Sequence, residues 1–122
     1  MPATVLCVTF DCADPVRVAA FWATALGYEE VPADEEDWVE IEDPFEQGPS
    51  LLFAPVPEPK VVKNRAHLDI KPETTMAAEV ERLMALGAST VDTRRHDTWT
   101  WTVMQDPEGN EFCVAEPLQG QS

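Results

Sequence analysis

The chain has few cations and no long apolar run. Its 122 residues include eight Lys and Arg against 23 Asp and Glu, which gives a formal net charge of −15. A charge of this sign repels phosphate backbones and anionic lipid surfaces, so it argues against nucleic-acid and membrane partners. No apolar stretch approaches the roughly 18 residues that cross a bilayer, and the first residues lack the basic region of a signal peptide. We therefore expect a cytoplasmic protein.

Cysteine is scarce as well. Cys7, Cys12 and Cys113 cannot all pair within one chain, and we expect them to be reduced thiols. A chain of this length, 44% of it hydrophobic, suffices for one core and not for two independent ones. These observations predict a single domain over residues 1–118, followed by a loose tail over residues 119–122.

The chain contains one pattern twice, and this is its most informative feature. Each copy has a strand that ends in Asp, then a helix with an Ala-Ala pair, then the tripeptide Ala-Leu-Gly. These features stand at Asp11, Ala19-Ala20 and Ala25-Leu26-Gly27 in the first copy, and at Asp69, Ala77-Ala78 and Ala85-Leu86-Gly87 in the second. The repeat predicts a pseudo-symmetric domain with a cleft. Its module 1 covers about residues 4–55 and its module 2 about residues 64–117.

Each copy has a capping residue before an apolar stripe of helical spacing and a Gly after it. This pattern predicts helices over residues 15–26 and 74–86, the first capped by Asp14 and the second by Thr74 or Thr75. Elsewhere the apolar residues alternate, which is typical of strands. Besides the strand that opens each copy, the predicted strands are residues 38–42, 50–53, 89–91, 98–104 and 111–115.

Turn and loop signals lie between these elements. The segment Asp-Pro-Glu-Gly-Asn over residues 106–110 predicts the turn of a hairpin between the last two strands. We expect solvated loops at the acidic residues 29–30 and 34–37. We expect a further loop at the basic residues 94–97, whose cations could attract an anionic ligand.

Alternation also shows which side chains share a face of a strand, because residues two apart point the same way. The polar residues that share faces are Cys7, Thr9 and Asp11, then His67 and Asp69, then Glu111 and Cys113. Trp99 and Trp101 likewise share a face, and they could wall a pocket for a planar or apolar ligand. The alternative in each case is structural: packing in a core, or carboxylates that bind backbone N–H groups at strand ends.

The repeat, the Asp-Cys-Ala-Asp-Pro entry to the first helix and the Asp-Pro-x-Gly-Asn turn together resemble the vicinal oxygen chelate superfamily. The likeness is greatest to its glyoxalase-like branch, which includes bleomycin-resistance proteins and dioxygenases. The resemblance implies an α+β fold in which two βαβββ modules form an eight-stranded, incompletely closed barrel with the helices outside. It also implies a small-molecule pocket on the concave face and a homodimer.

The resemblance places the metal ligands of the superfamily at Cys7, near Leu52, at His67 and at Cys113. A hard centre of Ni, Mg, Mn or Fe needs several nitrogen and oxygen donors, and Leu52 offers none. We therefore expect no cofactor. The alternative is a divalent metal such as zinc, bound by Cys7, His67 and Cys113 with an open fourth position.

A site without metal would use other groups of the same faces. His67, Asp69 and Glu111 are the candidate catalytic residues, since a His beside carboxylates suits general acid–base work. The candidate ligand-binding residues are Thr9, Asp11, Trp38, Leu52, Trp99 and Trp101.

The leading hypothesis is a glyoxalase-like protein that binds a small organic molecule, with or without transforming it, and uses no metal. One alternative is a metal-dependent lyase, isomerase or dioxygenase that uses His67 with Cys7 and Cys113. Another is a resistance protein that sequesters a drug as bleomycin-binding proteins do, which the charge of −15 would favour for a cationic drug.

Overall fold

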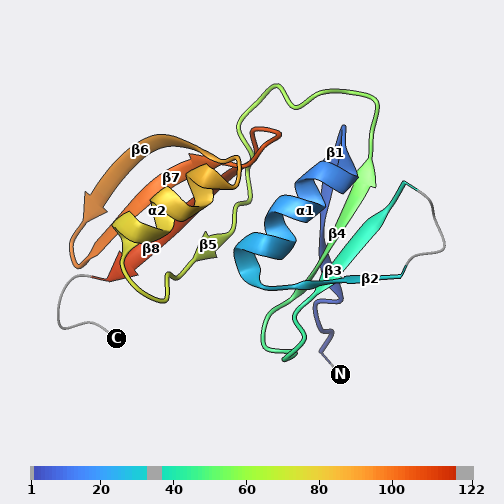
Figure 1. The fold of residues 1–122 in the computed structure, drawn as a ribbon, viewed down its shortest axis with the longest axis horizontal. Coiled ribbons are helices and arrows are strands. Elements are labelled where there is room, and N and C mark those ends of the chain that lie inside the picture. Colours follow the sequence, from blue (N-terminus) through green and yellow to red (C-terminus); the bar gives the residue numbers. More distant parts are fainter. Residues whose placement is uncertain (1, 33–36, 118–122) are drawn as a thin grey trace. The chain divides into compact units, whose positions relative to one another are not determined.

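The structure is a computed structural model that describes residues 2–32 and 37–117. It divides into two compact units with the boundary between Lys60 and Val61, and the predicted modules 1 and 2 lie one in each unit. Both modules run strand, helix, strand, strand, strand (Figure 1). Whether they form one domain, as the length predicts, stays a prediction. The predicted tail at residues 119–122 lies outside the described residues.

The elements of module 1 are β1 (Cys7–Cys12), α1 (Pro15–Leu26), β2 (Glu29–Val31), β3 (Val39–Glu42) and β4 (Ser50–Pro55). Those of module 2 are β5 (Asp69–Ile70), α2 (Met76–Ala85), β6 (Ser89–His96), β7 (Trp99–Gln105) and β8 (Glu111–Pro117).

Each module is one open four-stranded sheet with a helix packed on it. The strand orders are β1-β4-β3-β2 and β5-β8-β7-β6. In both sheets the first strand of the module pairs in parallel with the last, and the remaining neighbours are antiparallel. The predicted α+β class, with two βαβββ modules, eight strands and no closed sheet, is confirmed.

The helix ends follow from the capping residues that the sequence contains. The Asp14 carboxylate accepts a hydrogen bond of 3.3 Å from the backbone N–H of Arg17, and Pro15 is the first residue of α1. Gly27 stops α1 with a φ of 71°, a left-handed conformation that costs glycine little. Thr75, one of the two predicted caps, begins α2 by accepting a bond of 3.1 Å from Ala78. Both predicted helices are confirmed, the second within two residues of its bounds.

The core of module 1 is built around aromatic rings. Phe10 stacks on Trp22 and on Phe53, with ring centroids 6.2 and 5.4 Å apart. Trp22 and Phe53 are fully buried, and burying a large apolar side chain stabilises a fold by about 1.5–3 kcal/mol. α1 covers β1, β3 and β4 at this core.

Module 2 has a core of the same kind with fewer rings. The buried side chains under α2 are Leu83 from the helix itself and Met104, Phe112 and Val114 from the sheet. Phe112 and Val114 are alternate residues of β8, so they turn to the helix. The residues between them turn to the opposite face of the sheet.

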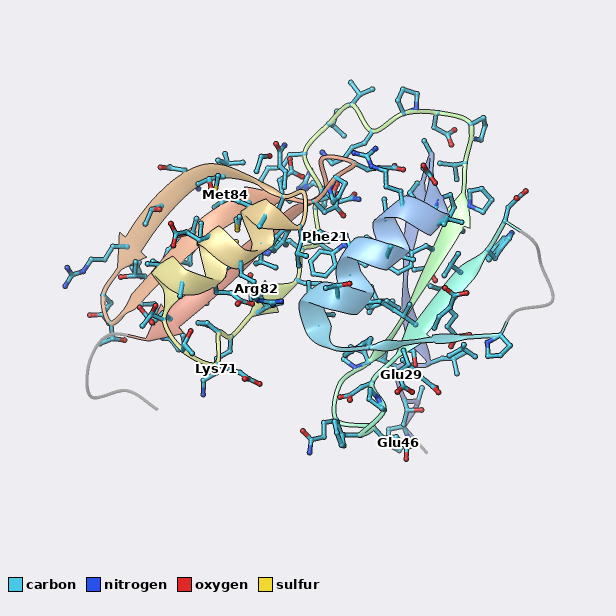
Figure 2. The ribbon with its side chains drawn as sticks, viewed as in Figure 1. Phe21, Glu29, Glu46, Lys71, Arg82 and Met84 are labelled. Atoms are coloured by element: carbon cyan, nitrogen blue, oxygen red, sulfur yellow. The ribbon has the colours of Figure 1, made fainter. Side chains whose placement is uncertain are left out.

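Two segments predicted as loops are strands. Residues 94–96 belong to β6, which pairs with β7 at every residue except Val91 and ends before Asp97, where φ is 54°. Glu29, which is labelled in Figure 2, and Glu30 belong to β2, whose backbone pairs with β3 while both side chains stay exposed. In both cases charged side chains in the sequence indicated a loop, and backbone pairing at a sheet edge overrode them. The predicted acidic loop at residues 34–37 lies outside the described residues except for Asp37.

Within the described residues, neither helix is long and apolar enough to cross a membrane.

Candidate functional site

The face of the module 2 sheet that turns away from α2 is hollowed. The cavity has a volume of about 760 Å³, and we call it the hollow. Alternate residues of three strands and part of the chain from Lys63 to Lys71 line it: Glu111, Cys113, Ala115, Trp99, Trp101, Val103, Arg94, His96, Lys63, His67, Asp69, Ile70 and Lys71. Its volume falls in the range of pockets that hold a small organic ligand.

Strand register brings the lining residues of β7 and β8 together. Val103 is paired with Cys113, and Trp101 with Ala115. Paired residues of antiparallel strands share a face, so these side chains stand side by side on the hollow. The shared face of Trp99 and Trp101 that the sequence predicts is therefore a wall of this hollow. Trp99 is 47% exposed, which excludes it from the core.

The hairpin between β6 and β7 decides which residues of β6 face the hollow. Counted from its turn, His96 pairs with Trp99 and Arg94 pairs with Trp101. Paired residues share a face, so Arg94 and His96 line the hollow beside the two indoles and Arg95 does not. Further from the turn, the register shifts between Thr90 and Asp92, so Val91 has no partner of its own in β7. This bulge of one residue exchanges the faces of the strand beyond it, at Ser89 and Thr90.

The hairpin turn before β8 fixes the chain at Asn64, next to Lys63 in the lining of the hollow. Inside the turn, the buried Asp106 carboxylate accepts hydrogen bonds from the backbone of Glu108 and from the backbone and side chain of Asn110. Asn110 in turn accepts a bond of 3.0 Å from the Asn64 side chain, and Glu111 accepts one of 2.9 Å from the Asn64 backbone. These contacts tie the chain beside Lys63 to the start of β8.

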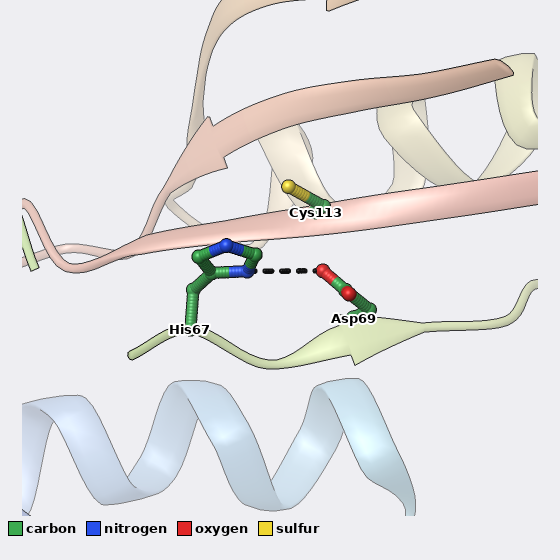
Figure 3. Close-up of side chains that lie close together, drawn as sticks. All are labelled: His67, Asp69 and Cys113. Carbon is green, nitrogen blue, oxygen red and sulfur yellow. Dashed lines mark hydrogen bonds and ion pairs between the residues drawn. The ribbon is translucent and has the colours of Figure 1, made fainter. Parts of the chain in front are cut away.

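Three chemically active side chains meet in the hollow (Figure 3). His67 Nδ1 lies 3.0 Å from Asp69 Oδ1. The ligand atoms of His67, Asp69 and Cys113 all lie within 4.8 Å of one another. Asp69 and Cys113 are partners in the parallel ladder of β5 and β8, which is why residues far apart in the sequence meet here. The His67 side chain is 37% exposed, so it is open to a ligand.

The thiol of Cys113 is held in its neutral form. Burial raises the pKa of Cys113 to about 11, helped by the charge of the neighbouring Asp69, while the cations Lys63 and Arg94 act in the other direction. At neutral pH the Cys113 side chain is therefore an uncharged thiol beside the Asp69 carboxylate. It is a poor nucleophile, because the thiolate is the reactive form.

These donors do not fit the hard metal centre that the superfamily resemblance implies. Imidazole, one carboxylate and one thiol lie together, whereas Mg²⁺, Mn²⁺ and similar ions prefer several oxygen and nitrogen ligands. Leu52, at one of the four implied positions, has a hydrocarbon side chain. A set of nitrogen, oxygen and sulfur donors is instead of the type that binds zinc.

The structure brings together the predicted site residues of module 2. His67, Asp69, Glu111, Cys113, Trp99 and Trp101 all line it. The other predicted site residues belong to module 1: Cys7, Thr9, Asp11, Trp38 and Leu52. Thr9 and Asp11 are exposed on β1, Leu52 is half-buried on β4, and the roles predicted for all five stay predictions.

Sequence reasoning missed the role of Arg94 and His96 as lining residues of β6 and that of Lys63, which precedes β5. A prediction that the strand continues to residue 96 and forms a hairpin with the strand of Trp99 and Trp101 would have paired Arg94 and His96 with the two indoles. Nothing in the local sequence marks the contacts of Asn64 that position Lys63.

Comparison with known proteins agrees with this architecture. The sequence model of a family described as glyoxalase-like domain matches residues 7–115. No curated protein matches the chain.

Solved structures of similar fold cover nearly the whole chain. One is a glyoxalase/bleomycin resistance protein/dioxygenase family enzyme from Burkholderia phytofirmans, 18% identical, with a TM-score of 0.75 over 95% of this chain and 100% of that one. Another is a mutant of the fosfomycin resistance protein FosX from Listeria monocytogenes, in complex with Mn(II) and 1S,2S-dihydroxypropylphosphonic acid. It is 14% identical, with a TM-score of 0.78 over 98% of this chain and 94% of that one. A glyoxalase-related enzyme from Fulvimarina pelagi is 19% identical, with a TM-score of 0.70 over 93% and 88%.

Proposed function

Because the chain belongs to the family of glyoxalase-like domains, we propose that module 2 binds a small organic molecule in its hollow and that His67 exchanges a proton with it. One observation carries this proposal: the 3.0 Å contact between His67 Nδ1 and Asp69 Oδ1 within a cavity of about 760 Å³. An imidazole oriented by a carboxylate, open to a ligand pocket, is the arrangement that general acid–base catalysis uses.

Asp69 sets the tautomer of His67. A carboxylate accepts hydrogen bonds only, so its contact with Nδ1 favours the proton on Nδ1 and leaves Nε2 with a lone pair. Nε2 is then the atom that takes a proton from a bound molecule.

Glu111, the third predicted catalytic residue, is less suited to take a proton. Its Oε1 accepts the Asn64 backbone N–H at 2.9 Å, and its Oε2 lies 3.5 Å from the Gln105 amide nitrogen. Protein donors thus occupy both oxygens. We assign Glu111 to holding Asn64, which positions the neighbouring Lys63 in the hollow.

The test is a fragment screen by nuclear magnetic resonance on metal-free protein, followed by transfer of bound carbonyl fragments to D₂O. We expect carbon-bound protons next to the carbonyl to exchange faster with the protein than without it. His67→Gln should abolish this exchange while binding persists. His96→Gln removes the other imidazole of the chain and should keep the exchange rate of the bound fragment. Fragments that bind without exchange in the wild-type protein would instead favour sequestration.

Zinc chemistry at the same residues is a second candidate, favoured by the clustering of His67, Asp69 and Cys113 within 4.8 Å. Elemental analysis of protein purified without chelator or affinity metal decides between the two. Near-stoichiometric zinc that is lost in both His67→Ala and Cys113→Ser would support the second candidate. No uptake of added zinc would exclude it and leave the metal-free proposal.

A further inference from the structure

Cations gather in the hollow of a chain that is otherwise acidic. Three of the eight Lys and Arg residues line it, namely Lys63, Lys71 and Arg94, and so do both histidines. Only two carboxylates line it, against 23 in the chain. The local balance of charge is therefore opposite in sign to that of the whole protein. Charge of one sign in a cleft attracts ligands of the other sign.

The two carboxylates of the hollow already have donors from the protein. Asp69 is bonded to His67, and Glu111 to the Asn64 backbone. These bonds satisfy acceptor positions that a cationic ligand would need. Arg94 also has a partner, since its Nε lies 3.1 Å from an Asp92 oxygen, but the guanidinium has further N–H groups for a second acceptor.

Lys63 and Arg94 line the same face of the sheet and reach the hollow from its two opposite edges. Lys63 precedes β5 at one edge, and Arg94 lies on β6 at the other edge. Both are near enough to Cys113 to favour its ionised form. An anion placed over the middle of the sheet would therefore interact with both cations.

Next to this point, Trp99 and Trp101 provide flat apolar area. They are alternate residues of β7, paired with His96 and Arg94 across the hairpin. Indole faces bind planar rings by stacking and by burial of apolar surface. Val103 and Ala115, both on the lining, add no polar group that would oppose a ring.

We propose that the ligand of the hollow is a planar, ring-bearing organic anion, with its ring against Trp99 and Trp101 and its carboxylate or similar oxyanion between Lys63 and Arg94. This inference rests on the proposed function and deepens it by naming the class of ligand.

The test uses three probes with one ring and three charges: 2-naphthoate, 2-naphthalenemethanol and 2-naphthylmethylammonium. Each is titrated into the full chain at neutral pH by calorimetry, with quenching of tryptophan fluorescence as a second readout. We expect 2-naphthoate to bind about tenfold more tightly than the alcohol, which is typical of one charge-assisted hydrogen bond. The ammonium should bind most weakly. The preference for the acid should shrink as salt is added.

Matched variants locate the anion. Arg94→Gln and Lys63→Gln should each remove most of the preference for the acid. Arg95→Gln is the control, because Arg95 is the next residue of the same strand, carries the same charge and does not line the hollow.

Three outcomes would overturn the inference. Equal binding of acid and alcohol, or tightest binding of the ammonium, would contradict the anionic class and leave a small-molecule pocket in place. A preference for the acid that Arg95→Gln removes as fully as Arg94→Gln would show a general charge effect. Absence of binding by all three probes would contradict both the ligand class and the proposed use of the hollow.

Discussion

Modules 1 and 2 share a topology and differ in the sheet face that turns away from the helix. No Lys, Arg or His occurs in β1, β2, β3 or β4, and the face of module 1 opposite α1 carries the carboxylates of Asp11, Glu29, Glu40 and Glu42. The corresponding face of module 2 carries cations, histidines and indoles. Strand order and helix packing were kept between the repeats while the chemistry of one face diverged.

The side of each sheet that contacts the helix has changed far less. Leu51 and Phe53 on β4 are buried, as Phe112 and Val114 are on β8. Large apolar groups stand at these positions in both modules because each sheet must bury one face against its helix. The comparison separates residues that maintain the fold from residues that are open to functional change.

The largest expected effect is on the free energy of unfolding, when a buried side chain of α1 or α2 is removed. Trp22→Ala should lower the free energy of unfolding by about 4 kcal/mol and Leu83→Ala by about 3 kcal/mol, because each removes a fully buried side chain and leaves a cavity. Urea denaturation followed by circular dichroism measures both. Val16→Ala on α1, at a residue that is 64% exposed, is the control and should change the value by less than about 0.5 kcal/mol. A loss below about 1 kcal/mol for Leu83→Ala would show that α2 contributes little to its module.

A smaller effect is expected at the turn that follows the third strand of each module. Asp43 and Asp106 both precede a Pro there, and each carboxylate accepts several N–H groups of its own turn. Asp106 is buried, so Asp106→Ala should lower the free energy of unfolding by about 2 kcal/mol as its donors lose their acceptor. Asp43→Ala should cost less, since water can replace the carboxylate there. Equal losses would contradict the role of burial.

The turn of module 1 adds a pH dependence. The backbone N–H of Phe45, with those of Gly48 and Gln47, holds the pKa of Asp43 below its usual value. The folded state therefore binds this proton less readily than the unfolded chain. The stability from these bonds is present above the ordinary pKa of 3.8 and is lost as pH falls through the lowered value. Asp43→Ala should remove this part of the acid dependence.

The smallest effect on stability is expected at Cys113, a buried thiol of module 2 that lies beside Asp69. Its alkylation by iodoacetamide should rise with a midpoint near pH 11, and Asp69→Asn should lower the midpoint toward 9 by removing a neighbouring negative charge. Since the folded pKa lies above that of the free thiol, stability from Cys113 is complete below about pH 9 and falls as pH rises toward 11. Asp11→Asn, at the matching Asp of module 1, should leave the midpoint unchanged. A midpoint at 9 in the wild-type protein would contradict the effect of burial on this thiol, and a midpoint unchanged by Asp69→Asn would contradict the influence of Asp69.

The sequence was sufficient for features that depend on neighbouring residues. The helix caps at Asp14 and Thr75, the turn at residues 106–110 and the shared face of Trp99 and Trp101 all follow from local patterns. Alternation likewise predicted that His67 shares a face with Asp69 and that Glu111 shares a face with Cys113, because alternation along one strand is a local property.

Features that depend on pairing between distant strands could not be predicted in this way. Asp69 meets Cys113 only through the parallel register of β5 and β8. Arg94 and His96 face the hollow because β6 continues to residue 96 and pairs there with Trp101 and Trp99. The charges of residues 94–97 indicated a loop instead. The predicted homodimer stays a prediction that sedimentation would test.

The bulge at Val91 lets β6 change in length without altering the wall of the hollow. The pairs of Arg94 with Trp101 and of His96 with Trp99 are counted from the hairpin turn at Asp97, and all eight residues of β6 are exposed. Loss of the codon for Val91 would therefore close the bulge and leave these pairs in register. A strand that absorbs a small insertion or deletion away from the ligand keeps its specificity, so new ligands would have to arise from point substitutions among the lining residues.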